Sequence, residues 1–526
     1  MEEPRSPKPL QNRFVNGLRI WKIIFGFVTI CSFFAGIIKI GEGAIHHIGP
    51  FRKGETGMKK RGIGKIVRRS VCVLLAAYLL AAILPYAFVP APPVREAAQA
   101  WQSAAVGDRA TILPTGEQAL DARLNLIANA KSSLVVGTYL FADDESGKTI
   151  AAALLSAAER GVHVRVLTDG LVGWANLLGS DLGYAMGVHP NIELRYYNPL
   201  NLLAPWGLNA RYHEKYVLAD DRIFVLGGRN VSDEFLTGEG DPHYNYDMDV
   251  LVYRDAPAGD SAAAALSAYF DGLWDTLCTP QFEAVPGYRQ EAVDRLRASL
   301  ALRYEAICRE RAEAVAPMDW AGLTVPIDGF ALLTNPASPS VKAPALWTQL
   351  IGLMRQAEER VWIQTPYLVL NSQMRDDLAE AAALPAEFAV LTNSRAVGNN
   401  IVASADLLLQ RGTLTRMDMA LYEFQGSASM HTKAMLIDRD LSVFGSFNFD
   451  MRSAYIDTEV MLAVKSEEVN AMLERHMLTM RAQSLPVEDD GSYGDNGGVR
   501  PAEIPWGKDL LIHIASPFIL LVRFLV

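Results

Sequence analysis

The sequence predicts an α/β protein made of two α/β-sandwich lobes related by pseudo-twofold symmetry, with N-terminal transmembrane segments before them. Three observations support this prediction. A polar motif occurs twice, the same order of helix and strand patterns precedes each copy, and long apolar stretches come before the first copy. Alternating helices and strands favour layered sheets, and duplication favours two lobes that share one site between them.

The repeated motif is His-x-Lys, four residues, Asp, six residues and Gly-(Gly/Ser)-x-Asn. Because the chain has only 9 histidines, two copies with the same downstream spacing are not accidental. The first copy contains His213, Lys215, Asp220, Gly228 and Asn230, and the second contains His431, Lys433, Asp438, Ser446 and Asn448.

The segments before each motif predict the same elements in the same order. Residues 120–141 and 148–170 give an amphipathic helix, a strand, a long helix and a second strand, and residues 345–369 and 374–394 repeat this order. Each motif then reads as a β-hairpin with an Asp-rich turn. Since residues i and i+2 of a strand share a face, the His and Lys of each motif project together.

The remaining motif residues suggest an anion site. Asp220 and Asp438 fall at the turns, where an Asp side chain commonly binds backbone, so we expect structural support from them more than chemistry. The glycines allow close backbone approach, and Asn230 and Asn448 are placed to donate hydrogen bonds. The expected anion is a phosphate.

The paired His-Lys-Asp motif resembles that of the phospholipase D superfamily, and the resemblance covers roughly residues 106–482. Within it, GGRNVSDEF followed by NYDMDV, the segments TPYLV and LTNSRAVGNN, and GSFNFDMRSAYIDTE resemble the bacterial cardiolipin synthases, above all the C-type branch. Gly228 is a departure, because many members have Ser there, although Gly-Gly-x-Asn is also familiar in that branch.

The resemblance implies phosphatidyl transfer to phosphatidylglycerol through a phosphohistidine, with no metal and no cofactor. One imidazole would attack phosphorus and the other would protonate the leaving alcohol. By analogy His213 is the nucleophile and His431 the acid/base, but the pseudo-symmetry leaves the exchange of roles open. Asp249 and Glu459, downstream of the respective motifs, are the candidates for orienting the two histidines.

Several alternatives remain open at this point. The phosphatidyl donor is phosphatidylglycerol or phosphatidylethanolamine, and hydrolysis would replace transfer if water were the acceptor. A membrane-tethered nuclease is less favoured, since a net charge of −10 argues against a nucleic-acid partner. Protein partners and oligomeric state are not predicted. Ser394, Asn399 and Asn400 fit either a substrate loop or a plain polar loop, whereas packing is favoured for Tyr139 and Tyr367.

Residues 70–89 form the strongest candidate for a membrane anchor, because the length of this apolar stretch suits one bilayer crossing. Six Lys or Arg residues lie between Lys59 and Arg69, so the N-terminal side should stay in the cytoplasm and the lobes outside it, at a bacterial cell membrane. A cleavable signal peptide is the disfavoured alternative. The apolar segment 20–40 would add a second span, unless translation starts at Met58.

The predicted division of the chain has five parts: an anchor region at 1–105, a first lobe at 106–285, a helical linker at 286–318, a second lobe at 319–486, and a linker with an apolar segment at 487–526. Pro517 disfavours a straight spanning helix in the last part, so we expect contact with the membrane surface there, with docking on the lobes as the alternative. Cys278 and Cys308 could pair if the lobes are extracytoplasmic.

Overall fold

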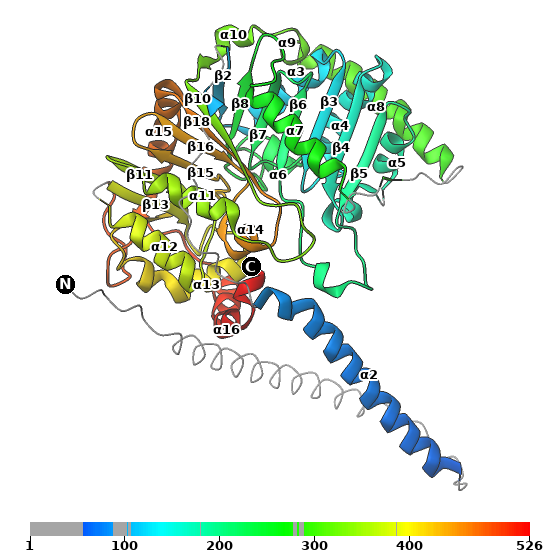
Figure 1. The fold of residues 1–526 in the computed structure, drawn as a ribbon, viewed down its shortest axis with the longest axis vertical. Coiled ribbons are helices and arrows are strands. Elements are labelled where there is room, and N and C mark those ends of the chain that lie inside the picture. The colour runs from blue at the N-terminus through cyan, green and yellow to red at the C-terminus, as the bar shows by residue number, and fades with distance from the viewer. Residues whose placement is uncertain are drawn as a thin grey trace, which may run out of the picture.

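The computed structural model describes residues 56–87, 102–103, 107–178, 180–276, 281–282, 289–384 and 387–526. Two twisted sheets, of eight and nine strands, lie against each other, and helices cover their outer faces (Figure 1). This arrangement confirms the predicted α/β class and the two lobes. The apolar segment 20–40, residues 88–89 and Cys278 lie outside the described residues, so the second span and the cysteine pair stay predictions.

Lobe 1 contains the eight-stranded sheet, in the order β5-β4-β3-β6-β7-β8-β2-β9. Its strands are β2 (Arg109–Leu113), β3 (Ser133–Thr138), β4 (His163–Asp169), β5 (Ile192–Tyr197), β6 (Lys215–Ala219), β7 (Ile223–Gly227), β8 (Asp249–Tyr253) and β9 (Val325–Pro326). Its helices are α3 (Gly116–Asn129), α4 (Glu145–Glu159), η1 (Trp174–Leu178), α5 (Asp181–Gly187), η2 (Pro205–Gly207), α6 (Asp233–Leu236) and α7 (Ala262–Trp274).

Lobe 2 contains the nine-stranded sheet, in the order β1-β10-β18-β16-β15-β11-β13-β14-β19. Its strands are β1 (Gln102–Ser103), β10 (Gly329–Thr334), β11 (Arg360–Gln364), β13 (Glu387–Asn393), β14 (Ala420–Phe424), β15 (Ala434–Ile437), β16 (Leu441–Gly445), β18 (Val460–Lys465) and β19 (Ser484–Pro486), and β12 (Leu368–Val369) pairs separately with β17 (Phe449–Asp450). Its helices are α11 (Ala345–Met354), α12 (Ser372–Ala382), α13 (Ile401–Leu414), α14 (Met451–Tyr455) and α15 (Glu467–Arg481).

The strand orders demonstrate the pseudo-symmetry. The run β5-β4-β3-β6-β7-β8-β2 in lobe 1 corresponds strand for strand to β14-β13-β11-β15-β16-β18-β10 in lobe 2. At one end of each sheet the short strand beyond the run is exchanged, because β9 pairs with β2 of lobe 1 whereas β1 pairs with β10 of lobe 2. Each lobe thus ends in a strand that comes from the segment leading into the other lobe.

A central core joins the lobes. Leu218 and Leu226 from the inner face of the first sheet are buried with Leu436 and Leu462 from that of the second. Two further cores lie under the outer helices, one for each lobe. The local sequence explains these helices: α3 begins with a capping box between Thr115 and Gln118, and the alanine-rich α4 is buried along most of its length. The apolar interface between the sheets therefore fixes the register of one lobe against the other.

Helices outside the two sheets connect and anchor the body. The linker contains α8 (Gln290–Glu310), α9 (Ala312–Val315) and α10 (Trp320–Leu323), and α8 packs on α4 and α5. At the N-terminal side α2 (Thr56–Ala87) projects from the body, and its segment Arg69–Ala87 is, within the described residues, the one helix long and apolar enough to cross a membrane. The domain limits given above remain predictions.

The C-terminal segment forms α16 (Trp506–Val522), followed by η3 (Arg523–Leu525). The helix continues through Pro517 and packs along α13 of lobe 2, where Ile512 and Ile519 are buried. Arg523 also forms an ion pair with the buried Asp406, 2.5 Å apart. The C-terminal helix therefore docks on lobe 2, which was the less favoured of the two predictions for this segment. Contact with a membrane stays a prediction for the outer face of α16.

Candidate active site

Both motif hairpins form as predicted, but their first strands begin after the histidines, β6 at Lys215 and β15 at Ala434. β6 pairs with β7 and β15 with β16, and the two turns place Asp220 and Asp438 at φ values of 53° and 48°. Asp220 accepts hydrogen bonds from the backbone N–H groups of residues 131–133, and Asp438 accepts them from residues 358–360. These bonds join each turn to the start of the adjacent antiparallel strand, which is β3 in lobe 1 and β11 in lobe 2. They support the structural role expected for the two aspartates.

Each motif is held by the opposite lobe. The backbone N–H of His213 donates to the carbonyl of Thr458 at 3.3 Å, and that of His431 donates to the carbonyl of Tyr246. Just before each histidine, a bridge pairs Tyr212 with Thr458 and Met430 with Tyr246. The two histidines therefore enter the interface by the same contacts, related by the pseudo-twofold axis.

The carboxylates beside the histidines are also exchanged between lobes. Glu459 Oε1 lies 2.9 Å from Nδ1 of His213, and Asp247 Oδ2 lies 2.7 Å from Nδ1 of His431. Asp247 and Glu459 are fully buried, while the histidine side chains keep 14% and 15% of their surface exposed. The sequence prediction was right that Glu459 lies beside a histidine but placed it in the wrong pair.

The prediction for Asp249 was wrong. In the sheets, Asp249 is the partner of Gly227, whereas the partner of Gly445 in lobe 2 is Met461, so the position equivalent to Glu459 is Asp247. Asp249 instead forms buried ion pairs with Arg123 at 2.9 Å and with Arg229 at 3.5 Å. Two aspartates stand two residues apart in the sequence, and only the register between strands tells them apart.

The two lysines lie against the histidines of their own motifs. Lys215 Nζ donates to the carbonyl of His213, and Lys433 Nζ lies 2.7 Å from Nδ1 of His431. Burial lowers the pKa of Lys215 to about 7 and that of Lys433 to about 8, although Glu459 and Asp247 oppose the shift. Both amines therefore titrate close to neutral pH, and a bound anion would favour their charged form.

The imidazoles are neutral bases in the free protein. Burial and the neighbouring lysines lower the pKa of His213 well below its usual range and that of His431 to about 3. A carboxylate at Nδ1 favours the tautomer with hydrogen on that nitrogen, which leaves the lone pair on Nε2. Each ring is thus oriented to react through Nε2.

The pKa values of the two carboxyl groups are shifted in opposite directions. Burial alone would raise the pKa of Asp247, but the Lys433 ammonium and the hydrogen bond from His431 hold it well below its ordinary value. Burial raises the pKa of Glu459 to about 8, in spite of Lys215 nearby. The pseudo-symmetric halves of the site are therefore not electrostatically equivalent.

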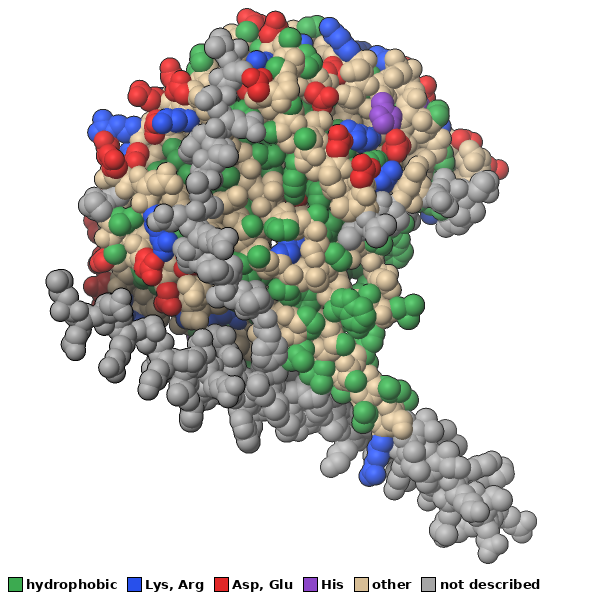
Figure 2. All heavy atoms as spheres, in the orientation of Figure 1, with side chains coloured by type: hydrophobic (Ala, Val, Ile, Leu, Met, Phe, Trp, Pro, Cys, Tyr) green, Lys and Arg blue, Asp and Glu red, His purple; other side chains and the backbone are tan. Residues whose placement is uncertain are grey.

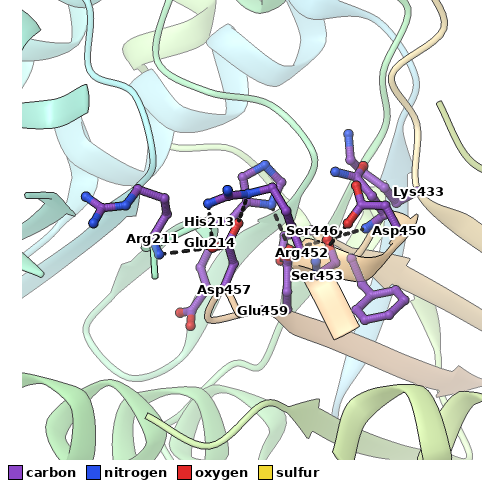
Figure 3. Close-up of polar contacts among 12 residues, drawn as sticks. Arg211, His213, Glu214, Lys433, Ser446, Asp450, Arg452, Ser453, Asp457 and Glu459 are labelled. Carbon is purple, nitrogen blue, oxygen red and sulfur yellow. Dashed lines mark hydrogen bonds and ion pairs between the residues drawn. The ribbon is translucent and has the colours of Figure 1, made fainter. Parts of the chain in front are cut away.

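Gly228 and Ser446 occupy equivalent positions but act differently. Ser446 Oγ donates to Glu459 Oε2, and Ser453 Oγ donates to Glu459 Oε1 at 2.6 Å (Figure 3). At Gly228, a Cβ atom would overlap the carboxylate of Asp247. The absence of a side chain in the first motif therefore leaves the room that Asp247 needs to reach His431.

Asn230 and Asn448 come after β7 and β16, the return strands of the two hairpins. Each is 7% exposed. Among the residues that the structure describes, their side-chain oxygens have no hydrogen-bond partner. A buried polar group without a partner is costly unless a ligand or water satisfies it. These oxygens are acceptors, so an anion would have to be bound by the Nδ2 groups of the two residues.

An aromatic ring contacts each of the two histidines. Tyr139 meets His213 edge-on at 5.2 Å between ring centroids, and Lys215 Nζ lies 5.4 Å from its ring. Phe235 lies 4.9 Å from His431. Tyr139 therefore packs at the border of the site, and a role in lining the substrate pocket stays the alternative. Tyr367 comes three residues after the end of β11, and burial raises its pKa to about 12.

A cluster behind His213 was not anticipated from the sequence. Arg452 donates to both carboxylate oxygens of Asp457, at 3.1 and 3.2 Å, and Asp457 accepts from the backbone N–H of Arg211 at 3.0 Å (Figure 3). Arg211 in turn forms an ion pair with Asp169 at 3.3 Å. Arg211 lies two residues before His213, and its contact with Asp457 links lobe 1 to lobe 2 at this point. The only sequence signal was their position beside the motifs.

The segment 394–400 has mixed roles. Asn400 caps α13 by accepting hydrogen bonds from two backbone N–H groups, as expected for a plain loop. Asn399 donates to Asn245 of lobe 1 at 2.9 Å, which joins the lobes close to Asp247. The hydroxyl of Ser394 is buried without a partner in the described part of the chain. The structure thus gives Asn399 and Asn400 structural contacts.

Two facing sheets with a His-Lys motif from each at their interface define a protein of the phospholipase D superfamily. Within it, the model of the family described as "Cardiolipin synthase, PLD-like domain" matches residues 124–274 and 350–481, more than half of the chain. The chain therefore belongs to this family.

Relatives and a solved structure agree with this assignment. The chain is 28% identical to cardiolipin synthase C of Escherichia coli (strain K12) over 69% of its own length and 83% of that protein. It is 25% identical to cardiolipin synthase A of Pseudomonas aeruginosa (strain LESB58), over 70% and 66%. The fold resembles that of phosphatidylserine synthase from Haemophilus influenzae Rd KW20, with a TM-score of 0.58, 14% identity and coverage of 82% and 98%.

Proposed function

We propose that this protein is a cardiolipin synthase, which transfers a phosphatidyl group to phosphatidylglycerol through a phosphohistidine. The observation that carries the proposal is the pair of neutral imidazoles, each held at Nδ1 by a carboxylate of the opposite lobe. Family membership and the similarity to two cardiolipin synthases support a phospholipid transferase of the phospholipase D type. Phospholipids are therefore its proposed substrates.

In the first half-reaction, Nε2 of His213 attacks the phosphorus of the donor lipid and the bond to the headgroup alcohol breaks. His431 gives its proton to the departing oxygen. His431 is neutral in the free protein, but the negative charge of a bound phosphodiester favours the imidazolium form that this step requires.

In the second half-reaction, a hydroxyl of phosphatidylglycerol attacks the phosphohistidine and gives its proton to His431. The bond between phosphorus and His213 breaks, so both histidines return to their starting states. Lys215, Lys433, Asn230 and Asn448 would hold the non-bridging oxygens and stabilise the charge of the transition state. The donor would be a second phosphatidylglycerol or phosphatidylethanolamine.

We also propose that α2 anchors the protein in a bacterial cell membrane with the lobes outside the cytoplasm. The cluster of six Lys or Arg residues between Lys59 and Arg69 precedes the apolar segment Arg69–Ala87 and supports this orientation. Labelling of a single surface cysteine by a membrane-impermeant maleimide in intact spheroplasts tests it. Labelling only after lysis would contradict it.

The decisive experiment is lipid analysis of cardiolipin-deficient bacteria that express the intact chain, with His213→Ala and His431→Ala as controls. Cardiolipin in cells with the intact chain, and none with either variant, is the expected result. Accumulation of phosphatidic acid would instead assign a hydrolytic phospholipase D. Unchanged lipids at equal expression would overturn the proposal.

The order of the histidines can be tested with purified protein. Donor lipid labelled in its phosphate should leave acid-labile, base-stable label on the protein when His213 is present and the second half-reaction is slowed by His431→Ala. The variant His213→Ala should stay unlabelled. If the phosphate label is found on the His213→Ala variant and not on the His431→Ala variant, His431 is the nucleophile and His213 the acid/base.

A further inference from the structure

The segment between β5 and β6 exposes a group of large apolar side chains. These are Leu200, Leu202, Leu203 and Trp206, with 55%, 62%, 90% and 52% of their surfaces exposed. Scattered apolar residues on a surface are ordinary, but four within seven positions of one loop make a concentrated apolar surface. We call residues 199–209 the apolar loop.

The apolar loop has a defined conformation. Asn198 at its base donates from Nδ2 to the carbonyls of Gly207 and Ala210, at 2.7 and 2.8 Å. At its tip the carboxamide of Asn201 accepts from the backbone N–H of Leu203 at 3.0 Å, and η2 forms the descending side. The leucines are thus held outward by hydrogen bonds, although turning inward would remove them from water.

The apolar loop adjoins the candidate membrane span. Tyr86 Oη, next to the last residue of α2, donates to the carbonyl of Trp206 at 2.6 Å, and Asn209 Nδ2 donates to the carbonyl of Ala82 at 3.0 Å. Figure 1 shows the loop beside the end of α2 that meets the body, and Figure 2 shows apolar side chains gathered there. If α2 crosses a bilayer, the loop stands at the level where the helix leaves it.

The end of α16 continues this surface. The element η3 after α16 also contacts α2. The outer side of α16 exposes Leu511, Ile514, Phe518 and Leu520, each more than half exposed, while its inner side packs on α13. Trp206 in the apolar loop and Trp506 at the start of α16 have the amphipathic rings that favour the bilayer interface. Lipid is the partner that matches an apolar surface contiguous with a membrane span.

We propose that the apolar loop inserts into the bilayer interface beside α2 and seats the body of the protein on the lipid surface. The loop leads directly into the site, because Asn209 accepts from Arg452 at 2.7 Å and Arg211 is bound to Asp457. Insertion therefore fixes the His213 half of the interface close to the membrane. This inference concerns lipid contact and does not depend on which phosphodiester reaction the site performs.

The test uses the full chain with its four cysteines replaced by serine, reconstituted in phosphatidylethanolamine and phosphatidylglycerol nanodiscs. A nitroxide label at Leu203→Cys is compared with one at Leu302→Cys, a leucine that is 65% exposed on α8, away from α2. At Leu203 the label should be relaxed by oxygen and protected from a water-soluble nickel chelate. The label at Leu302 should be relaxed by the nickel chelate and less by oxygen.

Two results would overturn the proposal. Equal access of the nickel chelate to both labels would place the loop in water. Protection of the Leu203 label from both relaxants would place it against protein, such as a second copy of this chain.

A Leu203→Glu variant provides a functional readout, with Leu302→Glu as its control. The Leu203→Glu variant should lose at least tenfold in turnover of vesicle lipid but little in mixed micelles. Absence of turnover in every sample would count against the proposed function and leave the label result intact.

Discussion

Glu459 Oε1 lies 2.9 Å from Nδ1 of His213, although the two residues are 246 positions apart and belong to different lobes. The equivalent contact joins Asp247 to His431 across the same interface. Neither lobe alone therefore contains a histidine with its carboxylate. The arrangement makes the site a property of the packed pair of lobes.

Loss of an orienting carboxylate should impair turnover. In Asp247→Asn the amide cannot stabilise an imidazolium at His431 as the carboxylate does, so we expect kcat to fall by about 10²- to 10⁴-fold. Steady-state assays with purified protein measure this. Asp247→Glu should recover part of the rate, whereas retention of full activity by Asp247→Asn would refute the assigned contact.

Asp249 should matter for stability. Asp249→Asn leaves the buried guanidinium groups of Arg123 and Arg229 without their carboxylate, a change that costs on the order of 3–5 kcal/mol. Thermal unfolding in detergent should show a clearly lowered Tm. If Asp249→Asn folds normally and loses only kcat, Asp249 has the catalytic role that the structure assigns to Asp247.

The turn aspartates should also act through stability. Burial alone would raise the pKa of Asp220, but three backbone N–H donors and the hydroxyl of Ser132 lower it below its ordinary value. A depressed folded pKa contributes stability above the unfolded value, and this contribution is lost as pH falls through the folded value. Asp220→Ala should cost roughly 1–3 kcal/mol near neutral pH.

The comparison with Asp221→Ala at the same turn is the control for Asp220→Ala, because Asp221 also has a positive φ, of 52°. The difference in Tm between the two variants should shrink in acid. A difference that stays constant from neutral pH down to the acid range would show that the carboxylate charge is not involved.

The pKa values of the two motif lysines predict how kcat/KM depends on pH in the alkaline range. With the pKa of Lys215 at about 7 and that of Lys433 at about 8, both ammonium groups lose their proton as the pH rises through this range. Because a phosphate needs the charged forms, kcat/KM should decline in two steps as the pH rises through about 7 and about 8. Lys433→Arg should remove the upper step, since a guanidinium stays charged. A flat profile up to pH 10, with the surface variant Lys465→Arg as reference, would contradict this explanation.

The sequence by itself determined the duplication, the paired motifs and the order of the main helices and strands along the chain. These features depend on local patterns: apolar periodicity, turn aspartates and the fixed spacing from His213 to Asn230 or from His431 to Asn448. Each hairpin needs only its own residues to form. That is why the predicted class, the two lobes and the two hairpins agree with the structure.

Only the tertiary structure decided which carboxylate serves which histidine. Asp247 and Asp249 are alike in the sequence, and the strand register that pairs Gly227 with Asp249 leaves Asp247 free to reach His431. The same packing brought Tyr139 to His213 and tied Arg452 to Asp457 behind it. Such contacts depend on how two apolar sheet faces fit together, and this fit is not encoded in any short stretch of the chain.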